Sequence, residues 1–381
     1  MATVANAIAP RRGCKLKIFP WRYVFEKTLK CYHFFLVNGV LVEGVDNVRG
    51  AVFSHFSSHF QGVSVDRPSM EALNFRRVTH REGLGLTKPF CVEEVKAAVW
   101  DCDNFKSLGP DGISFGFIKK IWDILTDDLM RFLHEFHRNG RLAKGINSTF
   151  IALIPKVDSP QRLNDFRPIS LVGSLYKILA KVLANRLQMV IGSVISDSQS
   201  AFIKGRQILD GILVANEIVD EARRRKKELL LFKVDFEKAY DSIDWGYLQE
   251  VMLKMGFSTL WRKWIKECVE TATTSVLVNG SPTGEFQLGR GLRQGNPLSP
   301  FLFLLAAEGF NVLMNSLSDS NLFTGYTVGG RDSMTVSHLQ FADDILILGN
   351  KSWANIVGIL RGFSKFYNPL SGRNPIETDL D

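Results

Sequence analysis

The sequence has few cysteines, and they form no pattern typical of a metal site or a disulfide framework. The 381 residues include five cysteines, and no two have CxxC spacing. An odd number without such spacing favours free thiols in a reducing compartment. The histidines also lack metal-ligand spacing, since His134 and His137 fall on an ordinary helical pattern. We therefore predict neither a structural zinc site nor a disulfide scaffold.

Long apolar runs are missing too. The longest uninterrupted one, Phe301 to Ala307, ends at Glu308, whereas a membrane-spanning helix needs about 20 apolar residues. The basic first thirty residues precede no apolar signal-peptide core, and a transit peptide stays an open alternative. There is no internal repeat and no low-complexity tract. With 45% apolar and 23% charged residues, the composition excludes a mostly disordered or collagen-like chain.

What the sequence does have is a concentrated surplus of positive charge. The formal net charge is +8, and residues 141–240 contain 17 Lys and Arg against 10 Asp and Glu. Five consecutive cations, Arg223 to Lys227, fit the C-terminal end of a helix, where they interact favourably with the macrodipole. A basic region also fits a polyanionic partner. Charge alone does not distinguish nucleic acid from an acidic membrane surface.

Hydrophobic periodicity predicts a mixture of helices and strands. The predicted helices are 45–62, 92–101, 115–138, 175–190, 208–222, 244–255 and 300–316, the last with Ser299 as N-cap and Pro300 at N1. The predicted strands are 150–155, a buried strand 229–236, a hairpin of 274–278 with 285–288, and a hairpin of 335–341 with 345–348. Residues 1–32 and 61–90 are predicted to be an extension and an irregular linker. Without a regular βαβ alternation, the predicted fold class is α+β.

Three aspartates stand at the ends of apolar strands. Asp235 is near the end of strand 229–236, and Asp343 and Asp344 occupy the turn of the last hairpin. Each alone is explained by the preference of aspartate for turns and strand ends. If the two strands lie side by side in one sheet, however, the carboxylates converge. Oxygen ligands of this kind suit Mg²⁺, and two such ions stabilise the attacking and leaving oxygens of a phosphoryl displacement.

The segment 291–300, GLRQGNPLSP, offers further polar groups. Gln294 can form hydrogen bonds, Arg293 can hold an anion, and Gly295 permits the backbone to approach a ligand closely. The alternative explanation is a loop that caps the following helix. The two explanations are compatible.

Five segments occur in a fixed order, and together they are specific. They are LNDFRPISL (163–171), QSAFIKGRQILDGI (199–212), KVDFEKAYDSIDW (233–245), GLRQGNPLSP (291–300) and FADDILIL (341–348). In this order they resemble the reverse transcriptase domain of a non-LTR (LINE-type) retrotransposon of the plant type. The resemblance covers about residues 33 to 370.

The resemblance implies a polymerase right-hand fold. An N-terminal extension and linker (1–90) would precede a helical part and fingers (91–228) and a palm with an antiparallel sheet (229–370). Residues 371–381 form a tail that departs from the family pattern. The family's thumb and its upstream endonuclease domain have no counterpart in this sequence, so the chain resembles a C-terminally truncated domain.

The implied activity is RNA-directed DNA polymerase. A primer 3′-OH attacks a deoxynucleoside triphosphate (dNTP) and pyrophosphate leaves, which requires an RNA template, a DNA primer and two Mg²⁺ ions, with Mn²⁺ as an alternative. Asp235, Asp343 and Asp344 fall on the catalytic, metal-binding carboxylates, and Tyr240 falls on the position that excludes a ribose 2′-OH. The residues implied in nucleotide or template binding are Arg167, Lys204, Arg206, Phe236, Tyr240, Gln294 and Gly295. The resemblance implies a nuclear site of action, and nothing in the sequence indicates a membrane or an obligate protein partner.

The sequence also departs from the family pattern. Asn296 stands where the family reads RQGDPLSP, and Leu108 stands in a turn that it reads as SPGPDG; we expect modest effects of both. Asp165 could simply pair with Arg167. Two alternatives to the active enzyme remain: an inactive remnant that at most binds nucleic acid, and an RNA-directed RNA polymerase, against which Tyr240 argues.

Overall fold

The structure is a computed structural model that describes residues 34–360, except 38, 63–69, 72, 106, 237 and 330–332. The predictions for residues 1–32 and for the tail 371–381 therefore lie outside the described residues. The helices are α3 (Val45–His59), α4 (His80–Thr87), α5 (Val92–Trp100), α6 (Phe115–Lys120), α7 (Trp122–Asn139), α8 (Ser174–Val194), α9 (Ile208–Arg225), α10 (Ala239–Ser242), α11 (Trp245–Lys254), α12 (Thr259–Glu270) and α13 (Ser299–Asp319). Residues 353–360 are also helical.

The strands form two larger sheets and two small hairpins. The strands are β1 (Phe34–Val37), β2 (Val40–Glu43), β3 (Ser148–Pro155), β4 (Phe166–Val172), β5 (Leu229–Asp235), β6 (Thr273–Val278), β7 (Ser281–Pro282), β8 (Phe286–Gln287), β9 (Tyr326–Val328), β10 (Met334–Val336), β11 (His338–Phe341) and β12 (Asp344–Asn350). The larger sheets have the orders β4-β3-β6-β7, with β8 also on β6, and β11-β12-β5. Only β3 with β6 is a parallel pair among these strands. Helices and strands occur together without a regular βαβ alternation, so the α+β class that the sequence predicts is confirmed.

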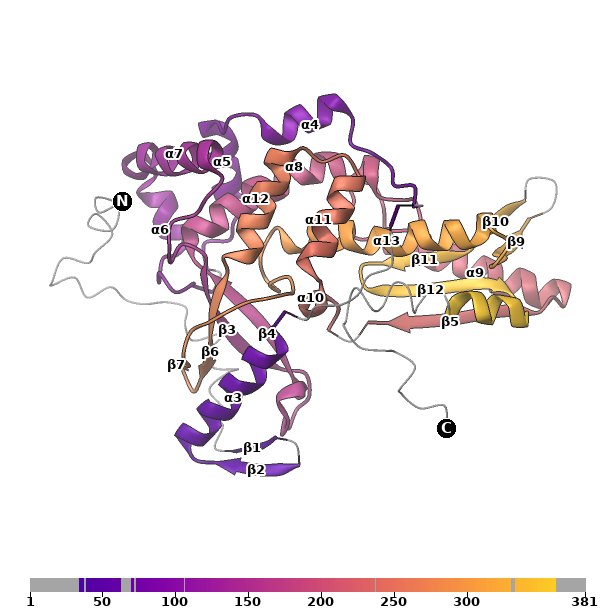
Figure 1. Cartoon of the computed structure of the whole chain (residues 1–381), viewed down its shortest axis with the longest axis horizontal. Coiled ribbons are helices and arrows are strands. Elements are labelled where there is room, and N and C mark those ends of the chain that lie inside the picture. Colours follow the sequence, from indigo (N-terminus) through magenta and orange to yellow (C-terminus); the bar gives the residue numbers. More distant parts are fainter. Residues whose placement is uncertain are drawn as a thin grey trace.

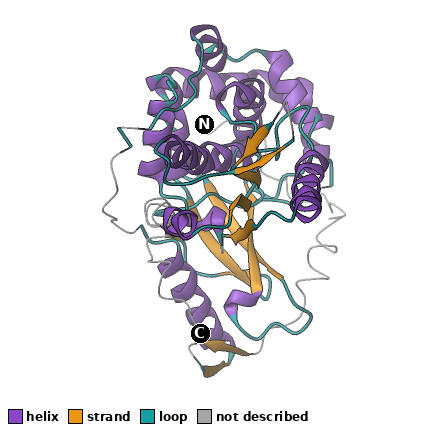
Figure 2. Ribbon diagram, turned by 90° about the vertical axis from the view of Figure 1, so that its right-hand side faces the viewer, coloured by secondary structure: helices purple, strands orange, loops and turns teal. Residues whose placement is uncertain are grey.

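Most of the helices lie together above the strands in Figure 1. The three-stranded sheet lies at the right beside α9, and α3 projects downward with the β1–β2 hairpin. Figure 2 shows these helices above the strands from the side. The central helix is α8, whose buried side chains lie on almost every face. A helix that is apolar all round belongs in the interior, and α8 packs against α4, α5 and α13.

Helix α13 is the one described helix that is long and apolar enough to cross a membrane. In the structure, 78% of its most apolar 18-residue stretch is buried within the protein. It packs against α8 and α11, so its apolar character is accounted for by the core. Its first residue is Ser299, and Leu298 is the N-cap without a side-chain bond. The prediction of Ser299 as the N-cap is therefore wrong by one position, whereas proline near the start is confirmed.

Several predicted boundaries need correction. Within the predicted linker, Thr79 and Glu82 form a capping box that starts α4, a T-x-x-E signal that was overlooked. The predicted helix 115–138 is two helices that meet at Ile121, and Gly140 in the left-handed conformation ends the second. The predicted strand 335–341 is also two elements, β10 paired with β9 and β11 paired with β12.

Strand β5 is not the buried strand that its apolar sequence predicts. It lies at the edge of the three-stranded sheet, and Leu231 and Phe232 are each 47% exposed. An apolar run fits a strand covered on both faces, but the described residues leave these two side chains partly open.

Candidate functional site

The sheet register brings the three predicted aspartates to one place. Strands β5 and β12 are antiparallel neighbours, and Asp344 is the direct cross-strand partner of Asp235. Asp343 is the second residue of the two-residue turn between β11 and β12. The prediction that the two aspartate-bearing strands lie side by side is thus confirmed. The side chain of Asp235 is outside the described part of the structure, so its convergence rests on the backbone pairing.

The carboxylate of Asp344 already has a cationic neighbour. Lys233 Nζ lies 3.2 Å from Asp344 Oδ1, and both side chains are more than half exposed. An ion pair this exposed contributes little free energy. Lys233 therefore reduces the negative charge near the strand ends without removing the capacity of the carboxylate to bind a cation.

Among the described side chains, no group of three His, Cys, Asp or Glu residues gathers as a metal site. Asp343 and Asp344 are among these described side chains, and Asp235 is not. Acidic residues at opposed strand positions repel each other, and a divalent cation with oxygen ligands relieves such repulsion. The donor types at the strand ends therefore fit Mg²⁺ or Mn²⁺.

Tyr240 lies on the short helix α10, five residues after Asp235. Its ring stacks on that of Phe303 of α13, with centroids 4.7 Å apart and an interplanar angle of 16°. Burial, together with the negative charge of Asp343, raises the pKa of Tyr240 to about 12. The phenol is therefore neutral near pH 7, and the negative charge of Asp343 is close enough to affect its pKa. Phe236 is half-buried against the same core.

The GLRQGNPLSP loop joins this region to strand β4. Leu292 N donates to Tyr240 O at 2.7 Å, and Ser170 N of β4 donates to Gln294 O at 2.7 Å. Gln294 Nε2 donates to Asp241 Oδ1 at 3.1 Å. Asp241 is buried and also lies 3.6 Å from His59 Nε2 of α3. Gln294 is thus positioned beside Tyr240 by a buried acid that the sequence reasoning did not single out.

Two further residues of this loop, Arg293 and Gly295, contact other parts of the protein closely. Arg293 is buried, donates to Thr149 Oγ1 at 2.8 Å and to Cys268 O at 3.1 Å, and stacks on Tyr176. The suggestion that Arg293 holds a bound anion is therefore wrong. Gly295 has a φ of 96°, and a Cβ there would lie 3.0 Å from Ser170 O, so its close approach is to β4.

Asn296, the departure from the family pattern, lies in the same interior. Its Nδ2 donates to the hydroxyl of Tyr176 at 3.0 Å, and its Oδ1 accepts from Leu298 N at 3.2 Å. Asn296 therefore fixes the backbone at Leu298, just before α13 begins, whereas α13 has no side-chain N-cap bond.

The predicted basic residues divide into two kinds. Arg167 on β4 and Lys204 are exposed, and Asp165 accepts from the backbone of Gln161 and Arg162 instead of pairing with Arg167. Arg206 is partly buried and donates to the carbonyls of Ile195, Ser196 and Gln199, and its Nη2 lies 3.1 Å from Asp197. The guanidinium of Arg206 is therefore engaged within the protein, while Arg167 and Lys204 are accessible to a polyanion.

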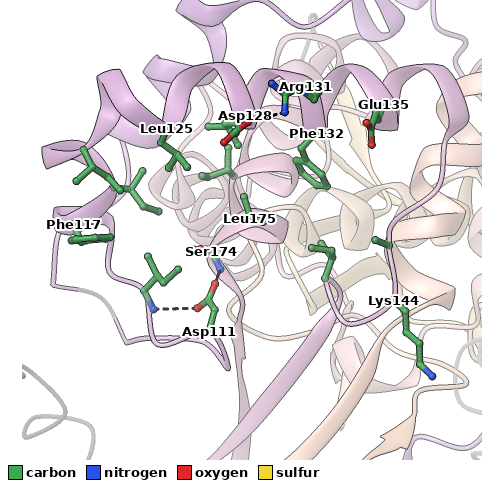
Figure 3. A pocket seen from close by; sticks show the side chains of 17 residues that line it. Asp111, Phe117, Leu125, Asp128, Arg131, Phe132, Glu135, Lys144, Ser174 and Leu175 are labelled. Atoms are coloured by element: carbon green, nitrogen blue, oxygen red, sulfur yellow. Dashed lines mark hydrogen bonds and ion pairs between the residues drawn. The ribbon is translucent and has the colours of Figure 1, made fainter. Parts of the chain in front are cut away.

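A cavity of about 420 Å³ lies elsewhere, between α6, α7 and the start of α8. Figure 3 shows its mainly apolar walls, with Leu125, Phe132 and Leu175 facing the space. Asp111 at its edge accepts from Ile113 N and Ser174 N and so caps α8. None of the predicted site residues lines this cavity. The turn 108–112 therefore has a structural role at the helix start.

The chain is similar to known proteins over most of its length. The family described as "Reverse transcriptase (RNA-dependent DNA polymerase)" matches residues 154–367. The chain is 30% identical over 325 residues to the transposon TX1 uncharacterized 149 kDa protein of Xenopus laevis, covering 85% of this chain and 24% of that protein. It is 29% identical over 269 residues to the retrovirus-related Pol polyprotein from type-1 retrotransposable element R2 of Popillia japonica, covering 68% of this chain and 35% of the relative. The chain thus spans about a quarter to a third of the length of these relatives.

Proposed function

The chain belongs to the reverse transcriptase family, and from this premise we propose that it is the RNA-directed DNA polymerase domain of a non-LTR retrotransposon. The implied reaction is attack of a DNA primer 3′-OH on a dNTP, directed by an RNA template, with release of pyrophosphate. The observation that carries the proposal is the register that sets Asp344 opposite Asp235, with Asp343 in the adjoining turn.

The three aspartates would hold the divalent cations. When bound, such ions act as Lewis acids at the phosphate and activate the attacking hydroxyl. The protein's own contribution is to fix the carboxylates at the ends of two paired strands and to place Tyr240 beside them. The ring of Tyr240, immobilised on Phe303, would occupy the space that a ribose 2′-OH requires. This geometry favours deoxynucleotides and argues against an RNA-directed RNA polymerase.

The nucleic acid would lie across the exposed basic residues. Arg167 extends from β4 and Lys204 from the segment before α9, and both are exposed. Exposed cations bind phosphate with release of counterions. We assign strands β3 and β4 with their helices to the fingers, and the sheet β11-β12-β5 with α13 to the palm.

The test is primer extension on an RNA template with Mg²⁺ and dNTPs. We expect extension by the wild-type chain and a loss on the order of 10³-fold in Asp343→Asn, because metal binding contributes several kcal/mol to the transition state. Asp319→Asn, an exposed aspartate at the end of α13, should extend like the wild type. If the wild type binds primer–template but extends no better than Asp343→Asn, the chain is the inactive nucleic-acid-binding remnant instead.

A further inference from the structure

A buried glutamine from a distant segment forms hydrogen bonds with the turn that contains Asp343. Gln199 is 1% exposed. Its Oε1 accepts from Ala342 N at 2.9 Å and from Ala201 N at 3.0 Å, and its Nε2 donates to Ala342 O at 3.3 Å. Both peptide groups of Ala342 are therefore bonded to one side chain 143 residues away in the sequence.

The hydrogen bonds from Gln199 are made to a residue with a strained backbone conformation. Ala342 has a φ of 53°, in the left-handed region that costs a residue with a Cβ about 1–3 kcal/mol. The carbonyl that Gln199 holds belongs to the peptide linking Ala342 to Asp343. The orientation of that peptide determines where the Cα–Cβ bond of Asp343 points. A side chain that fixes the peptide thus also fixes the direction of the carboxylate.

The backbone near Gln199 extends the sheet on its other edge. Gln340 N donates to Ser198 O at 2.8 Å, and Ser200 N donates to Gln340 O at 3.0 Å. The β11–β12 hairpin is consequently held from both sides, by β5 along β12 and by residues 198–200 along β11.

The segment that presents Gln199 is itself anchored. Arg206 donates to the carbonyls of Ser196 and Gln199. From α13, Glu308 Oε2 accepts from Ser196 N and Oγ, each at 3.2 Å, and Asn311 Oδ1 accepts from Ser198 Oγ at 3.0 Å. These bonds connect the residues just before Gln199 to helix α13, so Gln199 is held in place beside the Asp343 turn it contacts.

We propose that Gln199 is a positioning residue that sets the orientation of the Asp343 carboxylate for binding a divalent cation. The inference rests on the proposed function for its last step, the use of that cation in nucleotidyl transfer. Gln199 touches neither the cation nor the substrate, and it acts through the backbone of Ala342. A residue that merely stabilises the fold would change stability without changing cation affinity or the rate of a bound complex.

The main test compares Gln199→Met, which keeps the side-chain length and removes all three hydrogen bonds, with the wild-type chain. Amide hydrogen exchange at Ala342 should be at least about tenfold faster in Gln199→Met, because its acceptor is gone. Mn²⁺ affinity, measured by electron paramagnetic resonance, should weaken several-fold. In primer extension, kcat should fall on the order of 10- to 100-fold, because a small misplacement of a reacting group has effects of this size, with KM for the dNTP nearly unchanged.

Two further variants separate positioning from general destabilisation. Ser200→Ala removes only a side-chain bond to Gln340 O and should leave exchange, Mn²⁺ affinity and kcat as in the wild type. Gln199→Glu keeps an accepting oxygen for Ala342 N, so the amide exchange rate at Ala342 should lie between those of the wild type and Gln199→Met. This rate can be measured even if Gln199→Met does not fold.

The outcomes distinguish this inference from the proposed function. Unchanged Mn²⁺ affinity and kcat in folded Gln199→Met, or equal effects in Ser200→Ala, would overturn the positioning role. A wild-type chain that binds Mn²⁺ but extends no primer would overturn the polymerase function and leave the exchange and Mn²⁺ comparisons to decide the role of Gln199. A wild-type chain that binds no Mn²⁺ would overturn both.

Discussion

The surroundings of α8 and the three-stranded sheet differ in how their polar groups are satisfied. On α8, the guanidinium of Arg186 is 1% exposed and donates to both oxygens of Glu94 and to three backbone carbonyls. On the sheet, Lys233 and Asp344 form an exposed pair. The side-chain Nε2 and Oε1 of buried Gln340 on β11 have no hydrogen-bond partner.

This difference separates stability from function within one chain. Buried polar groups that are fully satisfied fix one packing arrangement, although their net stabilisation is modest. Functional sites instead retain exposed charges and incompletely satisfied groups. We therefore expect changes around α8 to act on folding and changes around the three-stranded sheet to act on chemistry.

The largest expected effect on stability is at Arg186. Replacing it by Met leaves the carboxylate of Glu94 and several carbonyls without their donor, and breaking a buried pair in this way costs about 3–5 kcal/mol. Urea unfolding should show this loss. Lys181→Met is the matched control on the same helix, since Lys181 pairs with the exposed Asp101 and should change stability by less than about 1 kcal/mol. An equal loss of unfolding free energy in Arg186→Met and Lys181→Met would show that the buried network around Arg186 is no more important for stability than an exposed ion pair.

The sequence predicted the elements that follow from local pattern. The strand ending at Asp235 and the hairpin turn at Asp343 are visible as apolar runs interrupted by acids, and their pairing is confirmed by the register. The capping box of Thr79 and Glu82 could also be predicted from the sequence, because it follows the local T-x-x-E pattern. The break at Ile121 was not, because neither glycine nor proline marks it.

The partners of polar side chains could not be predicted. Arg206 stands in a motif that suggests phosphate binding, yet its guanidinium folds back on the preceding loop. The hydrogen bonds between Gln199 and Ala342 join residues that are 143 positions apart. Contacts of this kind depend on the tertiary packing of segments distant in sequence, which no local periodicity encodes.

Glu308 lies at the boundary between the two regions and should give stability a pH dependence. Burial, the largest influence, raises its pKa to about 7, against hydrogen bonds from Ser196 and Asn311 and the charge of Arg76. Because the folded-state pKa lies above the unfolded value, the contribution of Glu308 to stability is fully present below about pH 4.5. It is lost as the pH rises through about 7 and amounts to at most about 3 kcal/mol.

Substituting Glu308 tests this dependence. Glu308→Gln should flatten the stability curve between pH 5 and 8, as measured by urea unfolding across that range. Comparing slopes removes any constant cost of the substitution. Glu217→Gln, an exposed residue paired with Arg224, should leave the slope unchanged. A slope that persists in Glu308→Gln would assign the pH dependence to other groups.

A smaller effect is expected at Tyr240, on selectivity instead of stability. Tyr240→Ala opens the space beside Phe303 and should raise ribonucleotide relative to deoxynucleotide incorporation by at least about tenfold. The ratio of kcat/KM for the two sugars measures it. Tyr240→Phe keeps the stacked ring and should retain the wild-type ratio. Unchanged selectivity in Tyr240→Ala would show that the ring only packs the core.

The smallest expected effect, on nucleic-acid affinity, separates the exposed Lys204 from Arg206, which is hydrogen-bonded within the protein. Lys204 is exposed, so Lys204→Ala should weaken primer–template binding only several-fold and lower the slope of log affinity against log salt by about 0.7–0.9, which is one lost phosphate contact. Arg206→Ala should leave the salt slope unchanged and instead speed amide exchange in residues 196–200, because Arg206 holds the carbonyls of Ser196 and Gln199 within that segment. Equal slope changes in both variants would mean that Arg206 leaves its internal partners when nucleic acid binds. The concentrated positive charge of residues 141–240 would then be more available to a polyanion than the free structure implies.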